Sequence, residues 1–245
     1  MNAVVPGRLH SWDLSTGVDG PGTRFVAFLG GCPLRCLYCQ NPDTWHMRDA
    51  TATTAAAVLR QAGAFVDFVR VAGGGLTVSG GEPLLQPGFT HALLTGGKAL
   101  GLHTALDTSG ALGARATDDL LDVTDLVLLD IKAWDPARYR RLTGGELGPT
   151  LDFARRLARR GTPVWVRYVL VPGLTDDLTG VDGVAGFAAG LGNVERVDVL
   201  PFHRLGAAKY DRLGLPFPLR DTSPPDRALV ERIRGRFLDA GLPTY

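Results

Sequence analysis

Short apolar runs rich in β-branched residues alternate with longer helical stretches along this chain. Each apolar run ends in glycine or polar residues, which is typical of a buried strand that runs into a loop. The strands predicted in this way are Arg24–Leu29, Gly75–Ser79, His103–Asp107, Asp125–Ile131, Val164–Val171 and Val194–Pro201. The helices predicted between and after them are Thr53–Val69, Phe89–Leu100, Thr117–Leu121, Thr150–Arg160, Gly180–Gly190 and Pro225–Ala240.

This alternation predicts an α/β fold with a parallel sheet, because each crossover between parallel strands takes up a helix. The unbroken apolar run Leu126–Leu129 fits a strand buried on both faces. Six strand–helix units predict a partial (βα)6 barrel instead of a complete eightfold one. We expect residues 1–245 to form a single domain, with residues 1–22 as an N-terminal hairpin or loop extension at the barrel mouth.

The composition is that of an ordinary globular protein, with 45% hydrophobic and 21% charged residues. The formal net charge of +1 gives no indication of a nucleic-acid or anionic-membrane surface. The first ten residues lack the apolar run of a signal peptide, and no stretch approaches eighteen uncharged apolar residues. We therefore expect a cytoplasmic protein that binds neither nucleic acid nor membrane.

All three cysteines of the chain lie within eight residues, as Cys32, Cys36 and Cys39. Three thiolates can hold three irons of a four-iron, four-sulfur cluster and leave the fourth iron open to a substrate. The odd count and tight spacing exclude a disulfide framework. Three other interpretations are a zinc site completed by His46, a redox dithiol made by Cys36 and Cys39, and cysteines that merely fill the core.

The carboxyl ends of the six predicted strands are rich in reactive side chains, and in parallel α/β folds these ends meet on one face. The segments that follow the strands are the cysteine motif, Ser79–Pro83, Asp107–Gly110, Asp130–Lys132, Arg167–Gly173 and Leu200–His203. Their convergence predicts an enzyme active site at this face.

Each of these side chains also has a structural interpretation. Glu82 can bind an ammonium group or can be the acid at a helix N-terminus. Asp107 and Asp130 end apolar strands, where an unpaired charge is costly, so we expect each to have Lys132, Arg167 or a metal ion as partner, or to form an ordinary salt bridge. His203 can contact a ligand or lie satisfied in the core.

Several of these motifs together resemble a known family. The spacing CxxxCxxC with Tyr38 before its last cysteine resembles the signature of the radical S-adenosylmethionine (SAM) enzymes, and Ser79–Glu82 resembles their second motif. Val18–Gly22, Asp125–Lys132 and Leu200–Gly206, continuing to Lys209–Tyr210, resemble the glycyl-radical-enzyme activating proteins, most closely those of the pyruvate formate-lyase type. No further cysteines follow the first motif, which is unlike relatives that carry a ferredoxin-like insert.

The resemblance implies a radical SAM barrel and a role for each matching residue. Cys32, Cys36 and Cys39 would hold a [4Fe-4S] cluster, and Gly80, Gly81 and Glu82 would line the methionine amino group of SAM. Lys132, Arg167 and His203 would contact the methionine carboxylate and the ribose or adenine, with Tyr38 also at the cofactor. Asp107, Thr108, Asp130 and the Leu128 carbonyl would bind a monovalent cation, Na⁺ or K⁺. Asp19 and Tyr38 would lie near the glycine loop of a partner enzyme.

The implied activity is reductive cleavage of SAM to a 5′-deoxyadenosyl radical, which takes a hydrogen atom from one glycine of pyruvate formate-lyase (formate C-acetyltransferase). No residue needs to act as a general base. The resemblance also implies a flavodoxin or ferredoxin electron donor and a monomeric protein. Gln40 departs from the histidine expected after the last cysteine, which bears on cluster hydrogen bonding. The rivals are a radical SAM enzyme for a small molecule, an activator of another glycyl-radical enzyme, and a zinc-binding interaction module.

Overall fold

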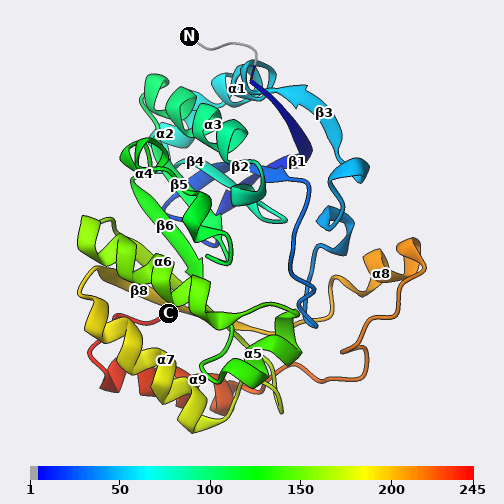
Figure 1. Ribbon diagram of the computed structural model, residues 1–245, viewed down its shortest axis with the longest axis vertical. Coiled ribbons are helices and arrows are strands. Elements are labelled where there is room, and N and C mark those ends of the chain that lie inside the picture. The colour runs from blue at the N-terminus through cyan, green and yellow to red at the C-terminus, as the bar shows by residue number, and fades with distance from the viewer. Residues whose placement is uncertain (1–4) are drawn as a thin grey trace. The chain divides into compact units, whose positions relative to one another are not determined.

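The computed structural model describes residues 5–245 (Figure 1), so the first four residues of the predicted N-terminal extension lie outside it. The chain forms two compact units. The first contains the described residues up to Pro33 together with Thr44–Thr108 and Leu112–Leu128. The second contains Leu34–Asp43, Ser109–Ala111 and Leu129–Tyr245.

The first unit is built on a sheet that contains the strands predicted for this part of the chain. Strand β1 (Pro6–Thr16) pairs antiparallel with β2 (Thr23–Leu29) on one side and with β3 (Thr51–Thr54) on the other. Strands β2, β4 (Gly75–Gly80) and β5 (His103–Thr108) are parallel, and the first residues of β6 (Leu126–Asp130) follow β5. Almost every residue of β2 and β4 is buried, as expected of strands covered on both faces.

Helices α1 (Ala55–Gly63), α2 (Val66–Val71), α3 (Pro87–Ala99) and α4 (Asp118–Asp122) belong to the first unit. Helix α3 packs against β4 and β5, and α2 packs against β2 and β4. The prediction of one helix over Thr53–Val69 is wrong. Thr54 is extended and ends β3, and its hydroxyl accepts a hydrogen bond from the Ala57 N–H to cap α1. A break after Gly63 then separates α1 from α2.

A buried arginine holds the amino ends of the first unit's parallel strands. Arg24 is fully buried, and its guanidinium donates to the Thr77 hydroxyl at 2.9 Å and to the Leu76 carbonyl at 2.7 Å. Thr77 in turn donates to the Asp19 carbonyl at 2.7 Å. Burial lowers the pKa of Arg24 to about 10, against the opposing effect of Asp125 and Asp19. This network fixes the turn between β1 and β2.

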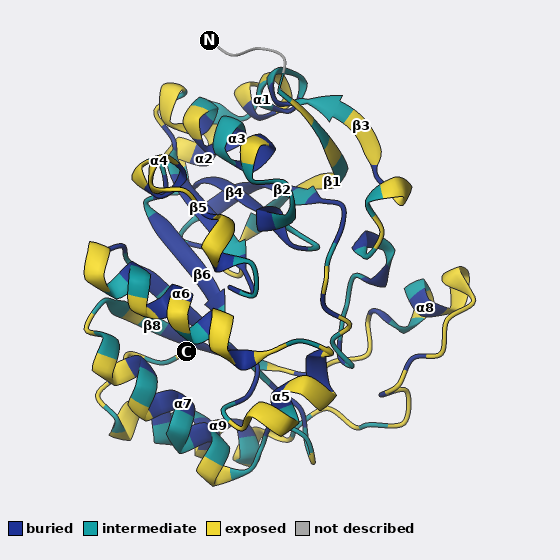
Figure 2. Cartoon of the chain, viewed as in Figure 1, coloured by how far each residue is buried: buried dark blue, intermediate teal, exposed yellow. Residues whose placement is uncertain are grey.

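The second unit contains the end of β6 followed by the parallel strands β7 (Val164–Leu170) and β8 (Val194–Pro201). Its helices are α5 (Pro136–Thr143), α6 (Leu147–Arg160), α7 (Leu178–Leu191), α8 (Ala207–Leu213) and α9 (Arg227–Asp239). Helices α6, α7 and α9 each present a buried side and an exposed side (Figure 2). α7 and α9 pack against β8.

Helices α5 and α8 lie outside the predicted set. Asp135 caps α5 through the Arg138 N–H at 2.7 Å, and Pro136 takes the first helical position. The Asp-Pro pair in the sequence is a signal for a helix start, but the short polar segment that follows it shows little of the apolar periodicity of a helix. Along residues 5–245, no helix has both the length and the apolar character needed to cross a lipid bilayer.

Candidate active site

Cys32 lies just beyond β2 in the first unit, in a loop held by backbone hydrogen bonds. The Gly31 N–H donates to the Thr44 carbonyl at 2.7 Å, and the Cys32 N–H donates to the Trp45 carbonyl at 3.1 Å. Gly31 has a φ of +97°, and a Cβ there would lie 2.6 Å from a Leu85 methyl carbon. Glycine is therefore required for the turn that presents Cys32.

Cys36 and Cys39 belong to the second unit and lie in one tight turn, in which the Cys39 N–H donates to the Cys36 carbonyl at 3.0 Å. The N–H groups of Arg35 and Leu37 donate to the last carbonyls of α5. This segment thus satisfies backbone groups that a helix C-terminus leaves open. All three cysteines are thiols, each partly exposed.

Charged side chains surround Cys36 within the second unit. Burial raises the pKa of the Cys36 thiol to about 11, opposed by the Lys132 ammonium and reinforced by Cys39 and Asp130. A thiol in this environment becomes a thiolate when an iron binds it, because a metal ion deprotonates a coordinating thiol. Lys132 is placed to stabilise the negative charge of such a thiolate.

Asp130, at the end of β6, forms an ion pair with Lys132 at 2.9 Å. Burial by itself would raise the pKa of Asp130, but Lys132 and then Arg167 outweigh it and lower that pKa. Burial would likewise lower the pKa of Lys132, yet the Asp130 carboxylate holds it well above its ordinary value. The Ile131 N–H donates to the Arg167 carbonyl at 3.2 Å, which fixes β7 beside this pair. The second unit therefore assembles three of the predicted site residues.

The backbone of the first unit leaves no room for side chains at the two glycines before Glu82. Gly80 has a φ of +119°, and a Cβ there would lie 2.1 Å from the Leu29 nitrogen. A Cβ on Gly81 would lie 2.3 Å from the Gly31 carbonyl oxygen. Both positions exclude a side chain because the backbone beyond β2 runs against them.

Glu82 is fully buried, and its carboxylate caps the short 3₁₀ helix Pro83–Leu85 by accepting the Leu84 N–H at 3.1 Å. The Thr108 hydroxyl donates to the same carboxylate at 2.6 Å. The structure therefore realises the structural interpretation of Glu82 as a helix N-terminal acid. Its predicted contact with the methionine amino group stays a prediction.

Asp107 and Thr108 end β5 in the first unit, as predicted. The Ser79 hydroxyl donates to the Asp107 carboxylate at 2.6 Å, so the second motif and the end of β5 are tied together. Leu128 is fully buried in β6. Among residues 5–245, no three histidine, cysteine, aspartate or glutamate side chains are gathered closely enough to ligate one metal ion. The cation site stays a prediction.

Asp19 lies in the turn between β1 and β2, at the amino end of β2, whereas Cys32 follows its carboxyl end. Seven strand residues separate the two ends, which corresponds to about 20 Å. The Ser15 hydroxyl donates to the Asp19 carboxylate at 2.5 Å. The structure thus does not bring Asp19 together with the strand-end residues of its own unit, and its predicted role in partner binding stays a prediction.

Tyr38 and His203 belong to the second unit. The Tyr38 ring lies beneath Lys132, with Nζ 5.7 Å from the ring centroid, and burial raises the pKa of its hydroxyl well above the ordinary value. That hydroxyl is buried and has no hydrogen-bond partner among residues 5–245. His203 is exposed beyond β8, and its Nδ1 accepts the Leu205 N–H at 3.4 Å.

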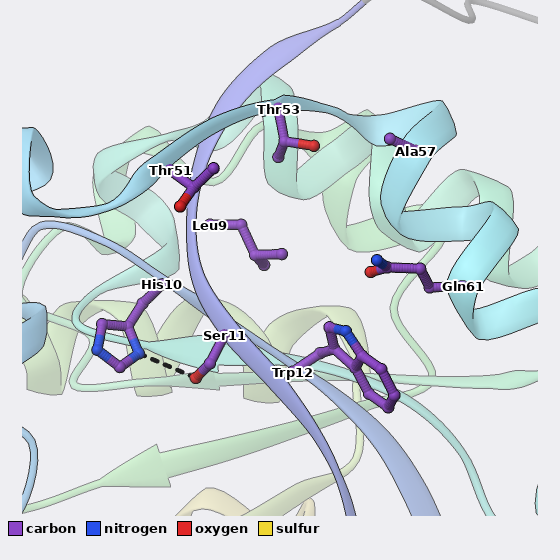
Figure 3. A pocket seen from close by; sticks show the side chains of 8 residues that line it. All are labelled: Leu9, His10, Ser11, Trp12, Thr51, Thr53, Ala57 and Gln61. Carbon is purple, nitrogen blue, oxygen red and sulfur yellow. Dashed lines mark hydrogen bonds between the residues drawn. The ribbon is translucent and has the colours of Figure 1, made fainter.

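A separate pocket of about 380 Å³ lies in the first unit between β1, β3 and α1. Figure 3 shows His10, Ser11 and Trp12 along one side of it and Thr51, Thr53 and Gln61 along the other. The pocket contains none of the predicted site residues, so it is not the predicted cofactor site.

Known proteins resemble this chain over most of its length. The family model described as "Radical SAM superfamily" matches residues 26–179. The pyruvate formate-lyase-activating enzyme of Listeria monocytogenes is 42% identical over 232 residues, which cover 92% of this chain and 94% of the relative. The pyruvate formate-lyase 1-activating enzyme of Escherichia coli K12 is 40% identical over 233 residues, covering 94% and 95%.

A solved domain of a pyruvate-formate lyase-activating enzyme from Bacteroides vulgatus has a TM-score of 0.59 at 25% identity, and the match covers 70% of this chain and 98% of that domain. The fold is therefore the α/β fold of radical SAM proteins, with an open, mainly parallel sheet. The chain belongs to the radical SAM superfamily and, within it, to the family of the pyruvate formate-lyase-activating enzymes.

The family implies a [4Fe-4S] cluster and SAM as cofactors, and the residues present fit both. A cluster of this type takes one thiolate at each of three irons, and three partly exposed thiols are available. The unpartnered Tyr38 hydroxyl is a buried polar group of the kind that a ligand satisfies. Cys32, Cys36 and Cys39 are the residues that would hold the cluster.

Sequence reasoning found the strand-end residues but missed the contacts that support them. The Gln40 amide bonds to three backbone groups, and the Lys209 ammonium binds Asn41 at 2.6 Å and Asp43 at 3.1 Å. Gln40 follows the cysteine motif and Lys209 lies in a matched motif, but His203 and Gly206 are more than a hundred residues from Gln40, as Asn41 and Asp43 are from Lys209. The unusual glutamine at position 40 was the one sequence feature that pointed to these supporting contacts.

Proposed function

We propose that this protein activates a pyruvate formate-lyase by converting one glycine of that enzyme into a glycyl radical. The observation that carries the proposal is the CxxxCxxC set of thiols in a chain that is 40% or more identical, over nearly its whole length, to activating enzymes of this kind. When bound, the cluster and SAM supply the electron and the 5′-deoxyadenosyl radical that removes hydrogen from the glycine α-carbon.

The protein's own residues would bind and orient SAM and shield it from water. We propose that Glu82, next to Gly80 and Gly81, receives the methionine amino group, and that Lys132, Arg167 and His203 receive the carboxylate and the nucleoside. The ion pair of Lys132 with Asp130 supports this role, because it holds the ammonium in one position. The Tyr38 hydroxyl supports a role at the cofactor, since it is buried with no hydrogen-bond partner in residues 5–245.

We further propose that a monovalent cation binds at Asp107, Thr108, Asp130 and the Leu128 carbonyl. The proposal is supported by the positions of Asp107 and Thr108 as the last two residues of β5 and of Asp130 as the last residue of β6, two residues after Leu128. It predicts that exchanging Na⁺ or K⁺ for a larger cation weakens SAM binding, and that Asp107→Ala and Asp130→Ala do the same. If cation exchange leaves the SAM affinity unchanged and both variants simply unfold, an ordinary structural role is correct.

The remaining parts of the proposal concern organisation and partners. We propose that both units act together as one radical SAM domain, because the matched residues 26–179 extend through both. The partner loop would lie near Asp19 and Tyr38, and a flavodoxin or ferredoxin would reduce the cluster. We expect a monomer that works in the cytoplasm, where thiolates stay reduced.

Mixing the anaerobically reduced, iron-loaded protein with SAM and a pyruvate formate-lyase tests the proposal. The expected result is a glycyl-radical doublet in the electron paramagnetic resonance spectrum. A peptide that copies the partner's glycine loop should stimulate 5′-deoxyadenosine formation, and the same peptide with alanine at the glycine should stimulate it much less. No doublet together with rapid turnover of a small metabolite would support a radical SAM enzyme for small molecules instead.

A further inference from the structure

Gln40 makes three hydrogen bonds that connect two distant parts of the second unit. Its amide nitrogen Nε2 donates to the Tyr38 carbonyl at 3.1 Å and to the His203 carbonyl at 3.0 Å. Its oxygen Oε1 accepts the Gly206 N–H at 2.7 Å. One side chain thus joins the turn that carries Cys36 and Cys39 to the loop that follows β8.

These bonds use the full donor capacity of the amide and determine its orientation. A carboxamide has two N–H donors and one oxygen, and here both donors meet carbonyl oxygens while the oxygen meets an N–H. Turning the amide over would place its oxygen against two carbonyls, so the opposite orientation is excluded. A side chain without both donor and acceptor groups cannot make this set of contacts.

The loop beyond β8 is shaped to receive Gln40. A Cβ on Gly206 would lie 2.9 Å from Gln40 Oε1 and 3.0 Å from its Cα, so the glycine allows the close approach. On the other side of His203, the Phe202 N–H donates to the Leu170 carbonyl at 2.9 Å. The His203 main chain is therefore held between β7 and Gln40, although its ring is exposed.

We propose that Gln40 is a positioning residue that holds His203 and Tyr38 in the arrangement in which they contact SAM. The inference rests on the proposed function, because it concerns two of the residues proposed to bind that cofactor. Gln40 itself contacts only the main chain of both residues. Its effect is to keep the His203 ring and the Tyr38 ring on one rigid support.

A second contact between the same two segments provides a matched comparison. Lys209 lies in α8, and its ammonium binds Asn41 and Asp43. These two residues follow Gln40 in the sequence, so the contact joins the same two segments without using the carbonyls of Tyr38 and His203. Lys209→Met therefore loosens the same loop without releasing the His203 carbonyl. If general loosening were all that mattered, Lys209→Met and Gln40→Met would have equal effects.

The test measures two properties of the full-length, cluster-loaded protein under anaerobic conditions, namely SAM affinity by equilibrium dialysis and hydrogen exchange of the Gly206 amide. Gln40→Met should raise the dissociation constant of SAM about tenfold and should speed Gly206 exchange by at least about tenfold. Gln40→Glu keeps an acceptor for Gly206 but loses both donors, so its SAM affinity should also fall while Gly206 stays better protected. Lys209→Met and the surface control Gln61→Met should change SAM affinity less than about twofold.

Unchanged SAM affinity in both Gln40 variants would overturn the proposal, as would equal losses in Gln40→Met and Lys209→Met. If Gln40→Met fails to fold, Gln40→Glu decides by its SAM affinity. If the unaltered protein binds SAM but gives no glycyl radical, the proposed function fails and the Gln40 inference stands on its own measurements. If the unaltered protein does not bind SAM at all, the proposed function and the Gln40 inference both fail. Exchange of the Gly206 amide then shows only whether the hydrogen bond between Gln40 and Gly206 exists.

Discussion

The two units hold their strand-end carboxylates in different ways. In the first unit, Glu82 accepts hydrogen bonds from the Thr108 hydroxyl and the Leu84 N–H, and Asp107 accepts one from the Ser79 hydroxyl. In the second unit, Asp130 accepts its hydrogen bond from the Lys132 ammonium. Hydroxyl and amide donors orient a carboxylate, whereas an ammonium also compensates its charge.

We expect this difference to correspond to different tasks in the two units. Oriented negative charge suits the binding of a cationic group, such as the ammonium of an amino acid or a metal ion. A buried ion pair suits a rigid support, because removing one partner leaves an uncompensated charge. The following predictions test the comparison, beginning with the largest expected effect.

Cysteines of both units should be essential for SAM cleavage, since Cys32 belongs to the first unit and Cys36 and Cys39 belong to the second. Serine at any one of these positions should abolish SAM cleavage, because three thiolates are the minimum for a cluster with one open iron. The measurements are 5′-deoxyadenosine formation and iron content, with about four irons expected in the unaltered protein. Full cleavage by any single serine variant would remove that cysteine from the ligand set.

Breaking the ion pair should cost far more stability than removing a neutral donor. Lys132→Met removes the ammonium that forms the ion pair with the Asp130 carboxylate and leaves the lesser compensation by Arg167, so it should lower the free energy of unfolding by about 3 kcal/mol. Ser79→Ala removes one neutral donor from Asp107 and should cost about 1 kcal/mol. Urea unfolding of both variants measures the two losses.

The double variant Lys132→Met/Asp130→Leu is the control for this pair, because it removes both charges together. It should recover part of the stability lost in Lys132→Met, since apolar groups of similar size often replace a buried ion pair without loss, while Arg167 loses its interaction with Asp130. Equal losses in Lys132→Met and Ser79→Ala would contradict the distinction between the two units.

Glu82→Gln separates helix capping from ligand binding. Glutamine keeps an oxygen that can accept the Leu84 N–H, so the free energy of unfolding should fall by only about 1 kcal/mol relative to the unaltered protein. SAM affinity should fall about tenfold, because a neutral amide attracts an ammonium group weakly. Asp135→Asn, at the N-cap of α5, is the matched control and should leave SAM affinity unchanged. Unchanged affinity in Glu82→Gln as well would show that Glu82 is only a cap.

The smallest expected effect is a pH dependence in the first unit. Burial alone would raise the pKa of Asp125, but the hydrogen bonds from Lys98 and Thr104 outweigh it and lower that pKa below the ordinary 3.8. The folded state therefore favours the ionised carboxylate, and this stabilisation is present above about pH 4 and is lost as the pH falls through the folded-state pKa.

Asp125→Asn should remove less than about 1 kcal/mol at pH 7, because the ion pair with Lys98 is partly exposed. The difference from the unaltered protein should shrink as the pH falls from 4 toward 2. Unfolding curves measured across this range check the prediction, and a difference that grows on acidification would contradict it.

Local sequence patterns predicted most of the strands because each strand is a continuous apolar run of the right length. They failed at Thr53–Val69, where the start of a helix is decided by the pairing of Thr54 with Pro6 and not by helix propensity. They also passed over α5, whose helical surface is largely polar. The carboxyl-end positions of Glu82, Asp107 and Asp130 followed directly from the strand predictions.

The sequence by itself indicated which side chains could hold the cluster, because the three cysteines of the chain lie within eight residues. It also determined which residues end the parallel strands. Only the tertiary structure decided how those residues are supported: Glu82 by Thr108, Asp130 with Arg167, and His203 by Gln40. The physical reason is that such contacts join residues far apart in the chain, and their partners depend on how strands and loops pack, which no local pattern of residues records.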